Sequence, residues 1–238
     1  MMGRSLWVVA VLAVAVATTG IQLDRKTRYV PTMASAVPEP FRAFAQSHIA
    51  TQALLDKKRE LALAEARRLV ARRPMPAAHL RLLSIAEFEA GNVEQGGYLI
   101  QLAARRGWRD RPAQHSMFQL ALAAGDQGEA ARRFAALFVR PSEEEAELRA
   151  LADGLFSEDS EEARAVFAQI VAGAERWQGA YLRKAPVVLP SDALIDVTSR
   201  ASKAGAVFDC IEGSRSVERL AKREPATAQA FRRALGTC

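Results

Sequence analysis

The residues of this sequence best suited to chemistry are three histidines and a pair of acidic side chains. His48, His79 and His115 lack the mutual spacing of metal ligands, and no HExxH pattern occurs. Glu143 and Glu147 lie one helical turn apart, as two carboxylates of one site would, but they belong to a solvated acidic stretch. A GxSxG nucleophile turn and a glycine-rich phosphate loop are both absent. We therefore predict that the protein is not an enzyme and holds no cofactor and no metal.

The two cysteines of the chain, Cys210 and Cys238, allow a different chemistry. An even number of cysteines permits a disulfide in an oxidising compartment. The alternative is that Cys210, which lies in an apolar stretch, is a small buried residue and that Cys238 is a free thiol at a frayed end. Both interpretations stay open from the sequence.

The charge pattern argues against a nucleic-acid partner. The chain carries 33 Lys and Arg against 27 Asp and Glu, a formal net charge of +6, but a basic region over 41–140 is followed by an acidic block over 141–180. Tracking of phosphates favours a continuous basic surface interleaved with stacking aromatics, or a recognition motif. Neither is present, so we interpret the paired arginines as solvated helix faces.

The N-terminus predicts a membrane segment. The 19 residues from Ser5 to Leu23 carry no charge, and at about 1.5 Å per residue a helix of this length spans roughly 28 Å, close to the hydrocarbon thickness of a bilayer. We favour a retained anchor that includes residues 1–29 and contacts the lipid bilayer through residues 5–23. A cleaved signal peptide, with Ala15-Val16-Ala17 as the cleavage site, is the alternative.

Two features of the sequence give opposite predictions for the side of the membrane. Arg25, Lys26 and Arg28 follow the apolar segment, and a count of basic residues favours a cytoplasmic body. The cysteine pair favours an oxidising compartment. We predict a single-pass inner-membrane protein with a periplasmic body; a soluble periplasmic form and a cytoplasmic-facing body are the alternatives. Residues 30–41, with Pro31, Pro38 and Pro40, are expected to form an extended linker of up to roughly 37 Å.

A recurrence organises the rest of the chain. Ala90-Gly91-Asn92 reappears as Ala124-Gly125-Asp126, 34 residues later and again between two helix-like stretches. This is the period of a helix pair, in which Gly takes a positive φ at the turn and Asn or Asp caps the second helix. We predict an all-α fold, a short right-handed α-solenoid of about four helix-turn-helix pairs over 42–180, with a C-terminal helical cap over 181–238.

The residues around these turns resemble the tetratricopeptide repeat family. The strongest match is the set Gly125, Asp126, Ala130, Phe134, Leu137 and Pro141, and a second match comprises Gly91, Asn92, Gly96, Ile100 and Ala103. The upstream register is kept by Ala62, Ala66, Leu69 and Pro74, without a turn Gly. Downstream, residues 162–167 echo residues 129–134 at a spacing of 33. We expect Ala130 and Ala163 to let paired helices approach, and Phe134 and Phe167 to fill the space between units.

The C-terminal region departs from this pattern. Residues 184–190, which include Pro186 and Pro190, are expected to interrupt the helices. Ser191-Asp192 is expected to cap the next helix, which would run to Ala204, and a last amphipathic stretch follows from Ser216.

The resemblance implies that the first helices of successive units line a groove that binds a protein or peptide. The candidate partner-binding residues are then Arg81, Glu89, His115 and Gln119. The expected function is that of a membrane-tethered adaptor for protein–protein interaction or assembly in the bacterial envelope. The alternatives are a structural subunit of an envelope complex and an exported helical enzyme that acts on cell-wall polymer.

Overall fold

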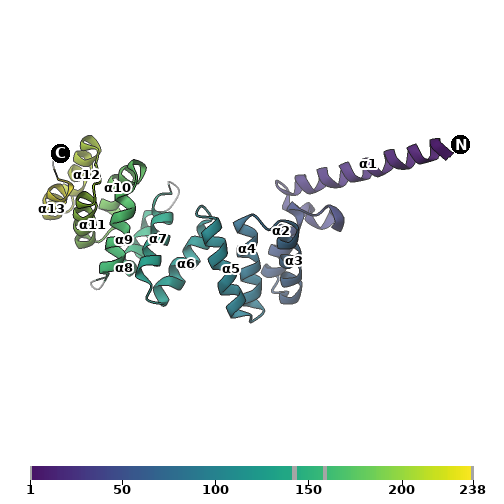
Figure 1. The fold of residues 1–238 in the computed structure, drawn as a ribbon, viewed down its shortest axis with the longest axis horizontal. Helices are drawn as coiled ribbons and strands as arrows, with labels where there is room; N and C mark the ends of the chain where they lie inside the picture. The colour runs from purple at the N-terminus through teal and green to yellow at the C-terminus, as the bar shows by residue number, and fades with distance from the viewer. Residues whose placement is uncertain (1, 141–143, 158–159, 237–238) are drawn as a thin grey trace. The chain divides into compact units, whose positions relative to one another are not determined.

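The structure, a computed structural model, describes residues 2–140, 144–157 and 160–236 and confirms the all-α prediction. One apolar N-terminal helix is followed in the chain by helices with repeat-like packing, and no strand occurs in the described ranges (Figure 1). The chain divides into two compact units, Met1–Ala113 and Gln114–Cys238, and each is described by itself.

The first unit consists of one projecting helix followed by two helix pairs. The helix α3 packs on α2, α5 on α4, and α4 on α3, so that the pairs stack in chain order (Figure 1). The bounds of its elements are α1 (Met2–Thr27), η1 (Pro31–Ala36), η2 (Glu39–Phe41), α2 (Phe44–Leu55), α3 (Arg59–Arg72), α4 (Ala77–Glu89) and α5 (Val93–Arg106). The boundary between the units falls within α6 (Arg111–Ala123).

The second unit is built around a cluster of aromatic rings. Ala130 and Ala163 are fully buried, and the rings of Phe134 and Phe167 lie 5.3 Å apart between centroids. The predicted packing roles of these four residues are thereby confirmed. The remaining helices are α7 (Gln127–Phe138), α8 (Glu145–Leu155), α9 (Glu161–Ala172), α10 (Glu175–Val188), α11 (Ser191–Lys203), α12 (Cys210–Ala221) and α13 (Pro225–Leu235).

The predicted turns have the expected backbone conformation. Gly91 and Gly125 take φ values of 86° and 72°. The residue after each donates its N–H to a carbonyl in the preceding helix, as Asp126 does to Ala121 at 2.9 Å, which is the hydrogen bond that closes a Schellman motif. Lys57, 34 residues before Gly91, takes φ 58° in the same kind of turn. The upstream repeat, predicted from its register without a turn Gly, therefore has the same turn, with a lysine in the position of the glycine.

Of the two helix caps predicted at the glycine turns, one is confirmed and the other is wrong. The carboxylate of Asp126 accepts a hydrogen bond from the N–H of Glu129 at 2.8 Å and so caps α7. The Asn92 side chain makes no cap, because its amide group donates to Glu87 at 2.7 Å. The carboxylate of Glu87 is buried and also accepts from Arg67 at 3.0 Å, and the donation from Asn92 supplies this buried acceptor with a second donor.

The proline-rich segment 30–41 is not the extended spacer that its composition predicted. It folds into η1 and η2, and Ala34 and Val37 are buried with Ala45 of α2. Proline suits the first turn of a helix because its φ is already helical and its missing N–H is not needed there. Once the apolar residues between the prolines can be buried, a compact segment is favoured over a solvated one.

The prediction that residues 184–190 interrupt the helices is also corrected. The helix α10 continues through Pro186 to Val188. Proline cannot donate to the carbonyl of Leu182, but the hydroxyl of Ser216 on α12 donates to that oxygen at 2.5 Å. The predicted cap at Ser191 is wrong as well, since Pro190 holds the cap position of α11 and the Ser191 hydroxyl donates to Glu224 at 2.6 Å.

Candidate functional site

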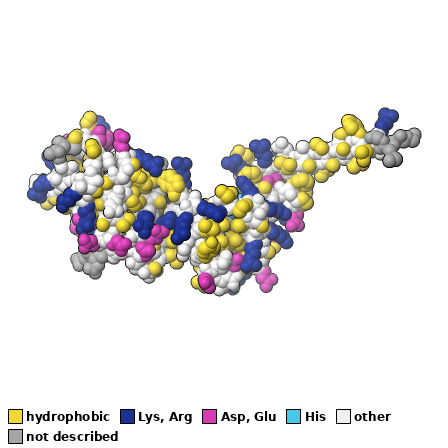
Figure 2. Space-filling model, viewed as in Figure 1, with side chains coloured by type: hydrophobic (Ala, Val, Ile, Leu, Met, Phe, Trp, Pro, Cys, Tyr) yellow, Lys and Arg dark blue, Asp and Glu magenta, His cyan; other side chains and the backbone are white. Residues whose placement is uncertain are grey.

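The first candidate site is the junction at which α1 meets the helix pairs of its unit. The part of α1 before Gly20 is almost entirely exposed and apolar, whereas Gly20, Asp24 and Thr27 are buried. A Cβ atom at Gly20 would lie 2.4 Å from the ring of Phe41, so a larger residue would have to displace that ring. In Figure 2 apolar side chains cover the projecting part of α1, and Lys and Arg side chains gather where it joins the unit.

Asp24 makes the polar contact that locks this junction. Its side chain, in a residue only 4% exposed, accepts hydrogen bonds from the N–H groups of Ala43, Phe44 and Ala45 at 2.9, 3.1 and 2.9 Å. These are the first N–H groups of α2, whose own cap position, Ala43, has no suitable side chain. A residue of the apolar helix therefore caps the next helix of the unit, and the direction of α1 is tied to α2.

The ring of Phe44 adds an aromatic contact beside this cap. The guanidinium carbon of Arg73 lies 4.7 Å from the ring centroid, and that of Arg28 lies 5.8 Å from it. Both distances are within the range of a cation–π interaction. The residue after α1, the start of α2 and the residue after α3 are thereby joined.

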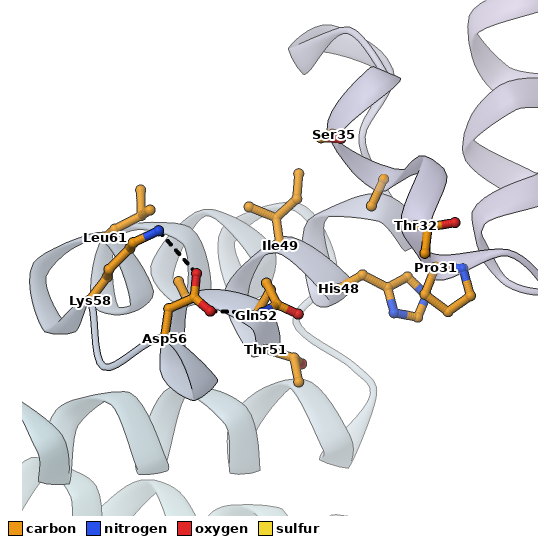
Figure 3. Close-up of a pocket in the computed structure, with 12 residues that line it drawn as sticks. Pro31, Thr32, Ser35, His48, Ile49, Thr51, Gln52, Asp56, Lys58 and Leu61 are labelled. Atoms are coloured by element: carbon orange, nitrogen blue, oxygen red, sulfur yellow. Dashed lines mark hydrogen bonds and ion pairs between the residues drawn. The ribbon is translucent and has the colours of Figure 1, made fainter.

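The second candidate site is a hollow of about 460 Å³ on the same unit, hereafter the α2 hollow. Its apolar surface comes from Pro31, Ala34, Ile49, Ala53 and Leu61. Figure 3 shows Ile49 and Leu61 pointing to the same side of α2 and α3. Leu61 is 45% exposed, and Leu55 nearby in the chain is 71% exposed. The polar residues that line the hollow are Thr32, Ser35, His48, Thr51, Gln52, Asp56 and Lys58.

Three polar side chains form a chain of contacts at the rim of the hollow. Lys58 Nζ lies 3.0 Å from Asp56 Oδ2, and the Gln52 amide donates to Asp56 Oδ1 at 2.8 Å (Figure 3). These two hydrogen bonds, that from Lys58 first, lower the pKa of Asp56 below its ordinary value. The rim thus keeps a charged pair at neutral pH.

Two of the polar groups in the hollow, the Asp56 carboxylate and the Thr51 hydroxyl, are poorly suited to proton transfer. Asp56 is exposed and its pKa is lowered, so it is a weak base, and the Thr51 hydroxyl is occupied by the carbonyl of Ser47 at 2.8 Å. No group of three or more His, Cys, Asp or Glu that could hold a metal ion occurs among the residues searched, which are the described ones. Apolar side chains that share a hollow with polar groups able to orient a ligand are the usual lining of a binding pocket.

The residues predicted to line a partner groove fall in both units. In the first, Arg81 Nε lies 2.9 Å from Asp110 Oδ1, and that carboxylate also caps α6 through the N–H of Ala113 at 3.0 Å. Arg81 thus has a structural contact. Glu89 is exposed, with its carboxylate 3.8 Å from Arg59.

In the second unit, His115 and Gln119 lie one turn apart on α6. His115 is half-buried and Gln119 is exposed. The partner-binding role of these two residues, and of Arg81 and Glu89, stays a prediction.

The sequence pattern missed Asp24 and the α2 hollow. The cap by Asp24 depends on a contact between residues about twenty positions apart, for which no local signal exists.

The remaining candidate residues have simpler settings. His79 Nδ1 lies 3.0 Å from the carbonyl oxygen of Arg73, and burial lowers its pKa. Cys210 begins α12 and is not a free thiol. Cys238 and Glu143 lie outside the described residues. The disulfide between Cys210 and Cys238 and the carboxylate pair of Glu143 and Glu147 therefore stay predictions.

Comparison with known proteins gives no match: no family model, no curated protein and no solved structure is similar to this chain. The fold class therefore stands on the helices themselves, an all-α array with repeat-like packing. The helix α1 is long and apolar enough to cross a membrane, a test that a signal sequence near the N-terminus also passes.

Proposed function

We propose that this protein is a membrane-attached, tetratricopeptide-like adaptor that binds a protein segment close to the bilayer. The observation that carries the proposal is the junction at Asp24, where an exposed apolar helix is hydrogen-bonded into a body of stacked helix pairs. An apolar helix that only had to bring the chain to a membrane would need no such contact. A fixed connection supports a body that is held at the lipid surface in one orientation.

The α2 hollow is the proposed place of binding. An apolar side chain of the partner would fill the space between Ile49 and Leu61, and the exposed Leu55 would extend the contact. Burial of such side chains supplies most of the affinity in protein recognition, while a polar rim such as Asp56 and Lys58 sets the orientation.

We place the body on the periplasmic side of the inner membrane. Support comes from Cys210, which is not a free thiol, because disulfides persist in oxidising compartments. Cleavage after Ala17 would leave Gly20, Asp24 and Thr27 in the mature chain, so a processed form keeps the junction. The mass of the N-terminal peptide of the purified protein distinguishes the two forms.

Site-specific photo-crosslinking tests the adaptor function. A photoreactive amino acid is placed at Leu61 of the full chain, and at Val93, which is also apolar and exposed but lies outside the hollow. We expect Leu61 to crosslink one or a few discrete membrane-associated proteins and Val93 to crosslink none of them. An Ile49→Lys variant, which places a charge in the hollow, is expected to lose these adducts.

The outcome also separates the adaptor from its alternatives. Adducts whose yield falls when the membranes are washed before irradiation support an adaptor, whereas a neighbour that is crosslinked in every molecule and at the same yield after that wash would make the protein a subunit of a permanent complex. Equal labelling from Leu61 and Val93, or adducts that survive Ile49→Lys, would remove the hollow as the binding place.

A further inference from the structure

Among the described residues, the basic side chains at the end of α1 and directly after it have no acidic partners. Arg25, Lys26 and Arg28 are exposed, and within the part of the chain that the structure describes none of them makes an ion pair. Other basic residues of this unit, including Lys58 and Arg67, do form ion pairs with acidic side chains. The acidic residue closest in the chain, Asp24, is buried with both carboxylate oxygens on backbone N–H groups. A surface of uncompensated positive charge results.

The junction fixes the depth of these residues relative to a membrane. Because Gly20, Asp24 and Thr27 pack on the unit, the freely exposed apolar part of α1 runs from Ser5 to Thr19. At about 1.5 Å per residue this part spans about 22 Å, which is shorter than the roughly 30 Å hydrocarbon core. The unit is therefore drawn against the bilayer surface and does not stand away from it.

At that depth the basic residues meet lipid headgroups. Arg25 lies about 9 Å along the helix from Thr19 at about 1.5 Å per residue, and long basic side chains extend toward the interface. Tyr29, which is 81% exposed, follows directly. Tyrosine at the edge of an apolar helix is typical of the membrane–water interface.

We propose that Arg25, Lys26, Arg28 and Tyr29, hereafter the α1 root, bind the headgroups of anionic lipids and so hold the unit flat against the membrane. The proposal rests on the membrane attachment proposed above and adds a lipid class to it. Each basic residue near an anionic surface contributes about 1 kcal/mol, which is about a fivefold change in affinity. Phosphate and carboxylate headgroups supply the charge that these residues lack inside the protein.

Native mass spectrometry of the full chain in non-ionic detergent tests this proposal. Phosphatidylglycerol and phosphatidylcholine with the same acyl chains are titrated separately, and the apparent Kd of the first retained lipid is compared. We expect wild-type protein to prefer phosphatidylglycerol, and the triple variant R25Q/K26Q/R28Q to lose most of that preference. The control K57Q/K58Q/R59Q removes the same charge from the turn between α2 and α3 and is expected to keep it.

Three results would overturn the lipid proposal. They are equal affinity of the wild-type protein for both lipids, a preference that persists in the triple variant, and competition by inorganic phosphate at the same concentration as the lipid. The double variant R25Q/K26Q, which keeps the Arg28 contact with Phe44, replaces the triple variant if the latter has a lower Tm.

Retention of the chain in carbonate-washed membranes is measured in parallel. If the wild-type protein is washed off these membranes, the membrane attachment itself is contradicted. If it is retained but shows no lipid preference, only the lipid proposal is contradicted.

Discussion

The carboxylate of Asp24 accepts a hydrogen bond at 2.9 Å from the N–H of Ala45, a residue in the first turn of α2. A side chain at the end of the apolar helix thus satisfies backbone donors that α2 cannot satisfy locally. This contact ties α1 to the start of α2, so the junction is part of the fold rather than a flexible tether.

Removal of this cap is expected to cost more than removal of an ordinary one. Asp24→Ala leaves three N–H groups of a buried helix end without their acceptor, and we expect a loss of about 2 to 3 kcal/mol in the free energy of unfolding. Asp126→Ala, which removes a single exposed cap bond, should cost about 1 kcal/mol. Denaturant unfolding of the full chain in detergent measures both, and equal losses would contradict the special role of Asp24.

The hydrogen bond from Ser216 to the carbonyl of Leu182 is expected to depend on Pro186. Ser216→Ala should cost about 1 to 2 kcal/mol, because the buried carbonyl loses its donor. In a Pro186→Ala background the helix supplies an N–H to the same oxygen, so the cost of removing the hydroxyl should fall. A double-mutant cycle on the unfolding free energy measures this coupling. Additive effects would show that the hydroxyl does not compensate for the proline.

Lys57 is expected to be a source of strain that glycine would relieve. Its φ of 58° lies in the left-handed region, which costs an L-residue about 1 kcal/mol relative to glycine. Lys57→Gly should therefore raise the Tm, whereas Lys58→Gly, at a residue with φ −86°, should lower it. A differential scan of both variants provides the measurement. A lower Tm for Lys57→Gly would show that the lysine side chain contributes a compensating contact.

A bulky residue at Ala130 is expected to overpack the aromatic cluster. Ala130 is fully buried on α7, so Ala130→Leu should cost about 1 to 3 kcal/mol. Ala124→Leu adds the same side chain at an exposed position and serves as the control. If the two variants melt at the same temperature, the close approach of the helices at Ala130 is not a constraint.

The stability of the second unit is expected to fall in acid partly through Glu129. Burial by itself would raise the pKa of this carboxyl group, but hydrogen bonds from Arg132 and Arg133 outweigh it and lower the pKa below the ordinary value of 4.5. A carboxyl group with a lowered folded pKa stabilises the fold above its unfolded pKa, and this contribution is lost as the pH falls through the folded pKa.

The variant Glu129→Gln should accordingly show a shallower loss of unfolding free energy between neutral pH and about pH 3. Glu94→Gln, at an exposed glutamate of α5, is the control and should follow the wild-type curve. The prediction fails if the wild type and Glu129→Gln lose stability in parallel.

Much of the fold could be predicted from the sequence because its signals are local. The positive φ at Gly91 and Gly125, the cap at Asp126 and the buried Phe134 all depend on residues within a turn or two of the chain. The site could be predicted only in part. The apolar run of α1 was evident from composition, but the α2 hollow requires η1 to fold back on α2.

The sequence by itself determined the helices, the 34-residue spacing of their turns and the presence of one apolar segment, because helix propensity, glycine conformation and hydropathy act over short stretches. Only the tertiary structure decided that Asp24 caps α2, that the proline-rich segment is folded, and that α10 continues through Pro186. In each of these cases a backbone group is hydrogen-bonded, or an apolar side chain is buried, by a residue outside its own helical turn. Such partners meet only after the helices have packed, and the free energy of burial then outweighs the local preference.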